Sequence, residues 1–173
     1  MNNPNISRVY VIDSSVAFYG GAQPELFAAS QKTSAVASAW FLARAAFHGA
    51  TLHVPSVFYT EVSTYVARDV LASGVLGLAD STSLLEDILS TAWDMHIAVF
   101  ADVLEIQQTL GNLDNTSDAE YLAVALGLGC TIITADEAFK LEVQAKNIDV
   151  PVMLVTDHRW AAPGSLEDFL PTD

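Results

Sequence analysis

Short runs of consecutive apolar residues recur along the chain, each separated from the next by a segment with helical periodicity. Four runs predict strands at residues 9–12, 52–55, 130–134 and 151–155, and residues 97–99 form a shorter fifth candidate. Continuous apolar runs of this length are typical of strands that are buried on both faces, as in a parallel sheet. The alternation therefore predicts an α/β domain with three layers, α/β/α, around a mainly parallel central sheet.

The segments between these runs carry apolar residues at helical spacing. They predict helices over residues 33–47, 56–71, 84–93, 100–110, 117–128 and 137–146. The expected caps are Thr33 or Ser34 for the first helix and residues 81–83 for the third. Before the first helix, Gly20, Gly21 and Pro24 predict a break in the chain.

The apolar positions of these helices predict which side faces the core. In the helix over residues 33–47 they are Val36, Trp40, Ala43 and Phe47. In the helix over residues 100–110 they are Phe100, Val103, Leu104 and Leu110. In the helix over residues 117–128 they are Leu122, Ala125 and Leu126, and Ser117 followed by Glu120 predicts a capping box at its start.

Composition and the ends of the chain restrict the class of protein. No apolar run reaches the roughly 18 residues that a membrane-spanning helix needs, and residues 1–7 are polar without a signal pattern. We therefore expect a cytoplasmic protein with no membrane partner. A single domain over residues 1–156 is predicted, followed by a C-terminal tail over residues 157–173.

The charge balance and the cysteine count exclude further classes. The net charge of −14 argues against the broad basic surface of a stand-alone nucleic-acid-binding protein. It is consistent with a cation site, with a basic partner, or with a solvated acidic surface. The single cysteine, Cys130, excludes an internal disulfide and a thiolate metal cage, and its apolar surroundings predict a buried, inert thiol.

Four acids from distant parts of the chain are expected to meet at one edge of the sheet. Asp13 ends the first strand, Glu61 lies in the helix after the second, and Asp136 follows the strand over residues 130–134. Asp118 opens a helix and is expected to lean toward the sheet. Because ligands of parallel α/β sheets bind outside the carboxyl ends of the strands, these positions predict one shared site.

The chemistry of clustered carboxylates indicates what such a site would hold. Neighbouring carboxylates repel one another and raise one another's pKa, so the cluster is unfavourable without a cation. Mg²⁺ or Mn²⁺ prefers carboxylate and water oxygens, polarises phosphoryl oxygens and lowers the pKa of bound water. The four acids therefore predict a divalent metal site for hydrolysis of a phosphodiester bond.

Each acid also has a purely structural interpretation. Asp13 and Asp136 would each cap the following turn or helix, and Asp118 would favour the helix dipole. Glu61 would be a solvated acid or an ion-pair partner of Arg68.

Other polar side chains are candidates for the surroundings of the site. Ser14 and Thr134 are expected, with Arg68, to bind substrate; their hydroxyls would orient a carboxylate or a metal-bound water, or would only satisfy backbone groups. Glu120 is assigned to the capping box, Asp114 to a turn, and Asp157 is the one acid of the tail expected to approach the site. The four histidines show no metal-ligand spacing.

Four segments of the sequence, in this order, resemble the PIN domain, and among PIN domains the VapC-type toxins of bacterial toxin–antitoxin pairs. The segments are residues 11–16, 55–62, 117–125 and 133–139, within a resemblance that runs from about residue 8 to residue 156. The resemblance implies a Mg²⁺- or Mn²⁺-dependent ribonuclease with metal ligands at Asp13, Glu61, Asp118 and Asp136, and with Thr134 as a hydroxyl near the site. It also implies inhibition by a small antitoxin protein and assembly as a homodimer.

Two other interpretations stay open, the first of them because basic residues are scarce. Only seven Lys and Arg residues are present to contact RNA, and Arg68, near Glu61, is the strongest candidate for a phosphate contact. One alternative is a catalytically silent PIN-like binding module or scaffold. The other is an aspartyl-phosphate hydrolase, which usually needs a second acid two residues after the strand-end aspartate, where this chain has Ser15.

Overall fold

The computed structural model describes residues 9–111 and 116–157. Their five strands form one parallel sheet in the order β3-β2-β1-β4-β5. The strands are β1 (Val9–Ile12), β2 (Thr51–Val54), β3 (Asp94–Met95), β4 (Thr131–Thr134) and β5 (Val152–Leu154). This arrangement confirms the predicted parallel sheet.

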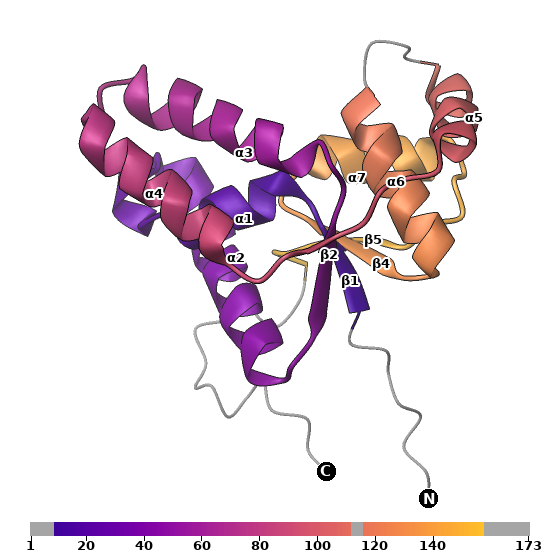
Figure 1. Ribbon diagram of the computed structural model, residues 1–173, viewed down its shortest axis with the longest axis horizontal. Helices are drawn as coiled ribbons and strands as arrows, with labels where there is room; N and C mark the ends of the chain where they lie inside the picture. Colours follow the sequence, from indigo (N-terminus) through magenta and orange to yellow (C-terminus); the bar gives the residue numbers. More distant parts are fainter. Residues whose placement is uncertain (1–8, 112–115, 158–173) are drawn as a thin grey trace, which may run out of the picture.

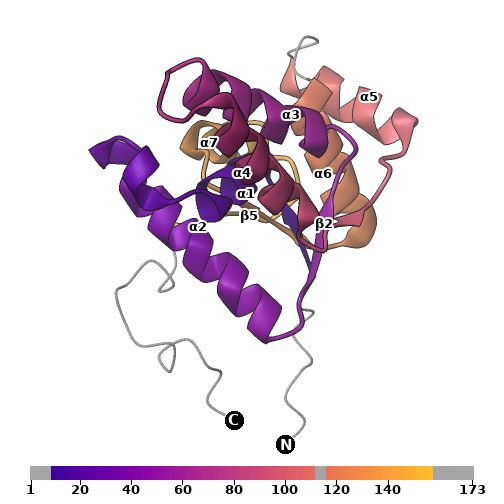
Figure 2. The same cartoon turned by 60° about the vertical axis from the view of Figure 1, so that its left-hand side comes forward.

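Helices cover both faces of this sheet (Figures 1 and 2). They are α1 (Ser14–Gly21), η1 (Pro24–Leu26), α2 (Ala29–Phe47), α3 (Phe58–Tyr65), η2 (Val66–Leu71), α4 (Leu78–Ser90), α5 (Phe100–Leu110), α6 (Thr116–Leu128) and α7 (Glu137–Ala145). In Figure 1, α1 to α4 lie on one side of the sheet, and α5 and α6 lie on the other. The predicted three-layer α/β/α fold is therefore confirmed.

The order of the strands creates a switch point between β1 and β4. From β1 the chain builds outward through β2 to β3, and it then returns to place β4 on the other side of β1. The two central strands are in register, with Ile12 opposite Ile133, and the Asp13 N–H donates to the Ile133 carbonyl at 3.0 Å. In open parallel sheets, this crevice between the carboxyl ends of two strands is where ligands bind.

The two central strands form the most buried part of the core. Val11 and Ile12 of β1 and Ile132 and Ile133 of β4 are all fully buried. Their branched side chains suit a sheet that is covered on both faces. This rigid centre supports the residues that follow each strand.

Helix α1 was not predicted, because its two glycines resemble a chain break. Gly20 and Gly21 lie inside the helix at its close contacts with other helices. A Cβ at Gly20 would lie 2.7 Å from Leu42 Cδ1, and a Cβ at Gly21 would clash with Ile88. The glycines therefore serve the packing of α1 against α2 and α4, which sequence alone does not reveal.

The predicted inward face of α2 is wrong. The helix begins at Ala29, before Thr33 and Ser34, so neither residue is its cap. Val36 and Phe47 are exposed, whereas the buried face consists of Ala35, Ala37, Ser38, Phe41 and Ala45. Small side chains allow α2 to approach the glycines of α1 closely, so packing prefers this face to the more apolar one.

Several other boundaries and faces differ from prediction. Helix α4 begins at Leu78, which places residues 81–83 inside it, and the third strand is Asp94–Met95 rather than residues 97–99. Phe100 and Leu104 of α5 and Leu126 of α6 are exposed. The predicted helix over residues 56–71 is α3 continued by the π-helical η2.

The start of α6 also corrects the predicted capping box. Because α6 begins at Thr116, Ser117 lies within the helix and is not its N-cap. Glu120 instead accepts a 3.0 Å hydrogen bond from Ser56 Oγ, which ties α6 to the segment before α3.

The remaining predictions concern the ends and a membrane. Within residues 9–111 and 116–157, no helix is both long and apolar enough to cross a membrane. Of the predicted tail, only Asp157 falls in the described part; residues 158–173, the polar segment over residues 1–7 and the turn acid Asp114 lie outside it.

Candidate active site

Asp13 lies at the carboxyl end of β1, at the switch point. It occupies the N-cap position of α1, yet its side chain makes no capping hydrogen bond. Instead, Oδ2 accepts hydrogen bonds from Ser15 Oγ at 2.6 Å and Thr134 Oγ1 at 2.5 Å, and Oδ1 accepts one from Ser14 Oγ at 3.2 Å. The geometry therefore disfavours a purely structural capping role for Asp13.

Glu61, from α3, joins the same hydrogen-bonded group. Its Oε2 accepts from Ser14 Oγ and from the Tyr121 hydroxyl, each at 2.8 Å. The Tyr121 hydroxyl in turn accepts a 3.2 Å bond from the Ser14 backbone N–H. Both bonds use the same carboxylate oxygen, so two hydroxyl groups fix the orientation of Glu61.

Asp136, after β4, is connected to Asp13 through Thr134. The Asp136 N–H donates to Thr134 Oγ1 at 2.9 Å, and that hydroxyl donates to Asp13. Asp136 also caps α7, because its Oδ1 accepts from the N–H groups of Ala138 at 2.8 Å and Phe139 at 3.2 Å. The predicted capping role of Asp136 is therefore carried by Oδ1. Within the described residues, Oδ2 takes no part in the cap.

Asp118 lies in the first turn of α6 and is partly buried. It is three residues before Tyr121, and side chains with this spacing lie on the same face of a helix. Since Tyr121 reaches Glu61, this face of α6 is turned toward the other acids.

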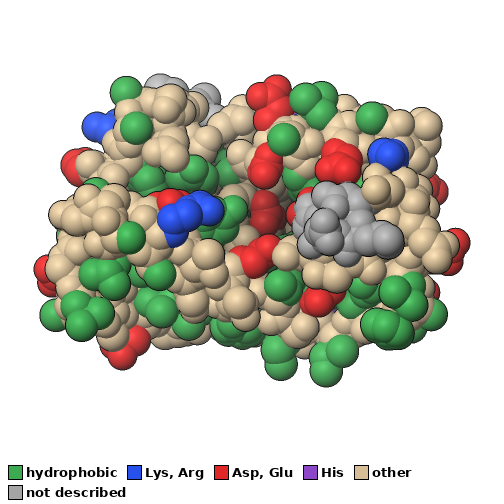
Figure 3. Space-filling model, turned by 90° about the horizontal axis from the view of Figure 1, so that it is seen from above, with side chains coloured by type: hydrophobic (Ala, Val, Ile, Leu, Met, Phe, Trp, Pro, Cys, Tyr) green, Lys and Arg blue, Asp and Glu red, His purple; other side chains and the backbone are tan. Residues whose placement is uncertain are grey.

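The acids lie beside an open cleft at the carboxyl ends of the strands. Figure 3 views this face and shows Asp and Glu side chains gathered around a central hollow. A cleft of about 520 Å³ is lined there by Ser15, Tyr19, Tyr65, Ala135, Asp136, Glu137, Ala138 and Leu141. The switch point therefore offers both acidic groups and space for a ligand.

The pKa shifts of Asp13 and Tyr65 reflect the charges of the neighbouring acids. Burial raises the pKa of Asp13; hydrogen bonds from Ser15 and Thr134 oppose this effect, and the charge of Glu61 adds to it. Burial also raises the pKa of Tyr65, and the charges of Asp13, Glu61 and Asp136 raise it further. The charges of three of the four predicted acids therefore act on the hydroxyl of Tyr65, so these three acids lie near the same side chain.

Two residues of this group were missed by sequence reasoning. Ser15 donates to Asp13 and accepts a 3.1 Å bond from the Ala135 N–H, so it joins the ends of β1 and β4. Tyr121 was assigned no role from the sequence. Its position three residues after Asp118 was the one available signal, because it places a hydroxyl on the same helix face as an acid.

Ser14 and Thr134 are both almost completely buried, at 1% and 0% exposure. Their hydroxyls bond the carboxylates of Asp13 and Glu61. Of the two roles considered, this arrangement favours orienting carboxylates over satisfying backbone groups. Direct contact with a substrate is disfavoured by their burial.

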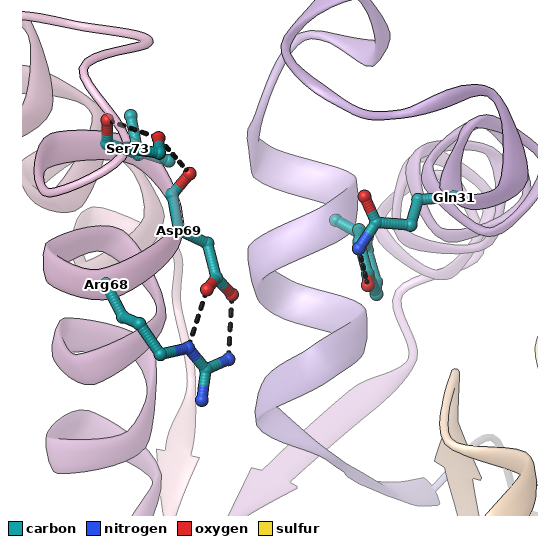
Figure 4. Close-up of polar contacts among 6 residues, drawn as sticks. Gln31, Arg68, Asp69 and Ser73 are labelled. Carbon is teal, nitrogen blue, oxygen red and sulfur yellow. Dashed lines mark hydrogen bonds and ion pairs between the residues drawn. The ribbon is translucent and has the colours of Figure 1, made fainter.

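Arg68 does not pair with Glu61, as one interpretation of the sequence had suggested. Its Nε and Nη2 donate to the two oxygens of Asp69 at 2.6 and 2.8 Å, as Figure 4 shows. The guanidinium also lies 5.2 Å from the centre of the Tyr65 ring, and Tyr65 lines the cleft. Arg68 therefore lies near the cleft, and two of its guanidinium nitrogens donate hydrogen bonds to Asp69.

Asp157 and His53 take partners outside the candidate site. Asp157 is exposed and pairs with Lys140 of α7. His53 Nδ1 lies 3.3 Å from a carboxylate oxygen of Asp94, which is on the adjacent strand β3. Neither contact involves the four predicted acids.

The donor set suits a hard divalent cation in its chemistry. Carboxylate oxygens are the ligands that Mg²⁺ and Mn²⁺ prefer. Within the described residues, however, no three Asp, Glu, His or Cys side chains are arranged as a closed metal-binding group. Mg²⁺ does not require one, because it usually keeps several waters and is held by one or two carboxylates together with substrate phosphates.

Comparison with known proteins agrees with this fold. The crystal structure of PAE2754 from Pyrobaculum aerophilum matches with a TM-score of 0.57 at 18% sequence identity. The match covers 91% of this chain and 94% of that chain. At this identity the similarity establishes the fold alone. No curated protein matches the chain.

The fold and the acids at its switch point define an α/β domain with a candidate hydrolytic site. Residues 10–141, well over half of the chain, match the PIN domain family. The chain therefore belongs to the PIN domain family. PIN domains are generally nucleases, which agrees with acids at the end of a parallel sheet.

Proposed function

We propose that this PIN domain is a metal-dependent endoribonuclease that hydrolyses RNA phosphodiester bonds. The observation that carries the proposal is the hydrogen-bonded group of Asp13, Glu61 and Asp136, with its four hydroxyl groups, beside an open cleft. Such ordered, partly buried acids are costly unless they bind a cation or a polar ligand. Asp118 completes the proposed set from the facing helix.

In this proposal Asp13, Glu61, Asp118 and Asp136 hold Mg²⁺ or Mn²⁺. When bound, the cation supplies charge for the phosphoryl oxygens and lowers the pKa of a bound water. Ser14, Ser15, Thr134 and Tyr121 hold the carboxylates in fixed orientations, so that little reorganisation is needed when charge develops.

Arg68 would contact the RNA backbone at the rim of the cleft. It is exposed and stacks on Tyr65, which lines the cleft. A phosphate would compete with Asp69 for the guanidinium fork, because both offer paired oxygens.

The biological setting proposed is that of a VapC-like toxin acting on RNA in the cytoplasm. An antitoxin protein would hold it inactive, and a homodimer would bring further basic residues to the RNA. The similarity of the four sequence segments to VapC-type toxins supports this setting.

The alternative is a catalytically silent PIN-like binding module. One observation favours it: no Lys or Arg occurs between Arg68 and Lys140, a stretch that includes Asp118 and Asp136. RNA affinity depends strongly on basic contacts with phosphates.

Cleavage of a mixed RNA substrate separates these functions. Purified chain would be assayed with Mg²⁺, with Mn²⁺ and with EDTA, beside Asp118→Asn and Asp13→Asn. Metal-dependent cleavage that both variants abolish is expected. Cleavage that survives in both variants, or a lack of cleavage after removal of any co-purified inhibitor, would contradict the proposal.

A further inference from the structure

Strand β3 is an open edge of the sheet. It pairs only with β2, and within the described residues no strand lies beyond it. The His96 N–H donates to the Val54 carbonyl at 2.9 Å, so His96 faces β2. Because successive residues of a strand turn their peptide groups to opposite sides, Met95 turns its own to the open side. The edge can therefore accept a further strand.

The side chains along this edge are apolar and exposed at alternate positions. Met95, Ile97 and Val99 are 53%, 74% and 61% exposed, and Val99 still has extended backbone angles. His96 and Ala98 between them are less exposed, and Ala98 packs against the core. We call Met95, Ile97, Val99 and the adjoining Phe100, which is 74% exposed, the apolar edge.

Strand β3 is only two residues long, and a short edge strand is one way in which proteins limit strand pairing, but the apolar edge has none of the other protective features. Natural edge strands are usually protected by Lys, by Pro, by inward charges or by a covering helix. No charged residue and no proline occurs between Asp94 and Asp102. In Figure 1 the chain crosses β2 here on its way from α4 to α5, along the outside of the sheet. A row of exposed apolar side chains beside free peptide groups is a typical site for strand addition.

The charge around the apolar edge determines which partner would fit. Asp94 and Glu105 are exposed and Asp102 is partly exposed, and no Lys or Arg occurs between Arg68 and Lys140. A second copy of this chain would bring two acidic rims together, which is unfavourable. A partner with basic residues would gain attraction from the same rims.

We propose that the apolar edge docks an extended segment of a partner protein, which alternates apolar residues with Lys or Arg and joins the sheet beside β3. Its backbone would bond the peptide groups of Met95. Its apolar side chains would cover Met95, Ile97 and Val99, while its basic side chains would meet Asp94, Asp102 and Glu105. This docking does not depend on nuclease activity, because β2 separates β3 from the switch point.

A fluorescent peptide of alternating Lys and Val tests the proposal by anisotropy on the full chain. The matched peptide carries N-methyl groups on alternate amides, which removes its strand hydrogen bonds but keeps its charge. We expect the N-methyl peptide to bind about tenfold more weakly. Ile97→Asp should also weaken binding about tenfold, although it adds a negative charge. Leu78→Asp, at a 69% exposed position on α4, is the control and should leave binding unchanged.

Three results would overturn the proposal. Equal binding of both peptides, or unchanged or tighter binding by Ile97→Asp, would show only non-specific attraction to an acidic protein. Sedimentation that finds a dimer in the unaltered chain and a monomer in Ile97→Asp would show that a second copy occupies the edge. Ile97 is mostly exposed, so Ile97→Asp should fold, and an unchanged thermal melting curve checks this.

Discussion

The Tyr121 hydroxyl of α6 donates a 2.8 Å hydrogen bond to Glu61 Oε2 of α3. These two helices contribute to the site from separate parts of the chain, 60 residues apart in sequence. The same hydroxyl accepts from the Ser14 N–H, directly after Asp13. Tyr121 therefore links Glu61 to the backbone that follows Asp13 and fixes the orientation of Glu61.

Replacing Tyr121 with Phe removes this hydroxyl and leaves the ring. Groups that orient metal-binding side chains typically alter metal affinity or activity by about 10- to 100-fold. We expect RNA cleavage to fall within that range and Mn²⁺ binding, followed by electron paramagnetic resonance, to weaken. Tyr59→Phe, on the same helix as Glu61, is the control. Unchanged Mn²⁺ binding and cleavage in Tyr121→Phe would refute the orienting role.

Thr134→Val removes a fully buried hydroxyl that serves both Asp13 and Asp136. Valine has nearly the same shape, so the loss is that of the hydrogen bonds. Leaving buried groups unsatisfied should cost about 1–3 kcal/mol of unfolding free energy, measured by urea denaturation. Thr134→Ser keeps the hydroxyl and should recover most of the cleavage activity. If valine supports cleavage as well as serine does, the hydroxyl is not needed.

Two leucines of α6 provide a test of the observed core. Leu122 is fully buried and Leu126 is 50% exposed, although both were predicted to face inward. Leu122→Ala should lower the unfolding free energy by about 2–5 kcal/mol, because it leaves a cavity. Leu126→Ala should change it by less than about 0.5 kcal/mol, as is usual for surface positions. Equal losses in urea titrations would contradict the helix orientation.

Asp69→Asn tests whether Arg68 is available to RNA. The aspartate holds two donors of the guanidinium and cancels its charge. If Arg68 contacts phosphate, its release should increase RNA affinity by about fivefold, measured by anisotropy at low salt with EDTA present. The double variant Asp69→Asn, Arg68→Ala should lose that gain. A gain that persists without Arg68 would reflect only the lower negative charge of the surface.

Much of the architecture was predictable because its signals are local. The apolar runs that end at Asp13 and at Thr134 identify two buried strands without reference to any other segment. Parallel sheets place strand ends at one edge, so the neighbourhood of Asp13 and Asp136 followed from this local reading. The metal-binding role of these acids stays a prediction.

The predictions for α1 and α2 failed because the packing between these helices is not visible in the local sequence. The inward face of α2 was assigned by hydrophobicity, yet Val36 and Phe47 are exposed because the small residues Ala35 and Ser38 allow close contact with α1. The glycines of α1 were read as a break for the same reason. In each case the neighbouring helix, and not the local pattern, determined the outcome.

By itself the sequence determined the parallel α/β fold and the positions of the strand-end acids, because periodicity is a property of short segments. The tertiary structure alone decided which hydroxyls hold which carboxylates. Ser14 and Tyr121 are 107 residues apart, and Asp13 and Thr134 are 121 apart. It also left Met95, Ile97 and Val99 exposed at an open edge. Such contacts depend on how whole elements pack, which no segment encodes separately.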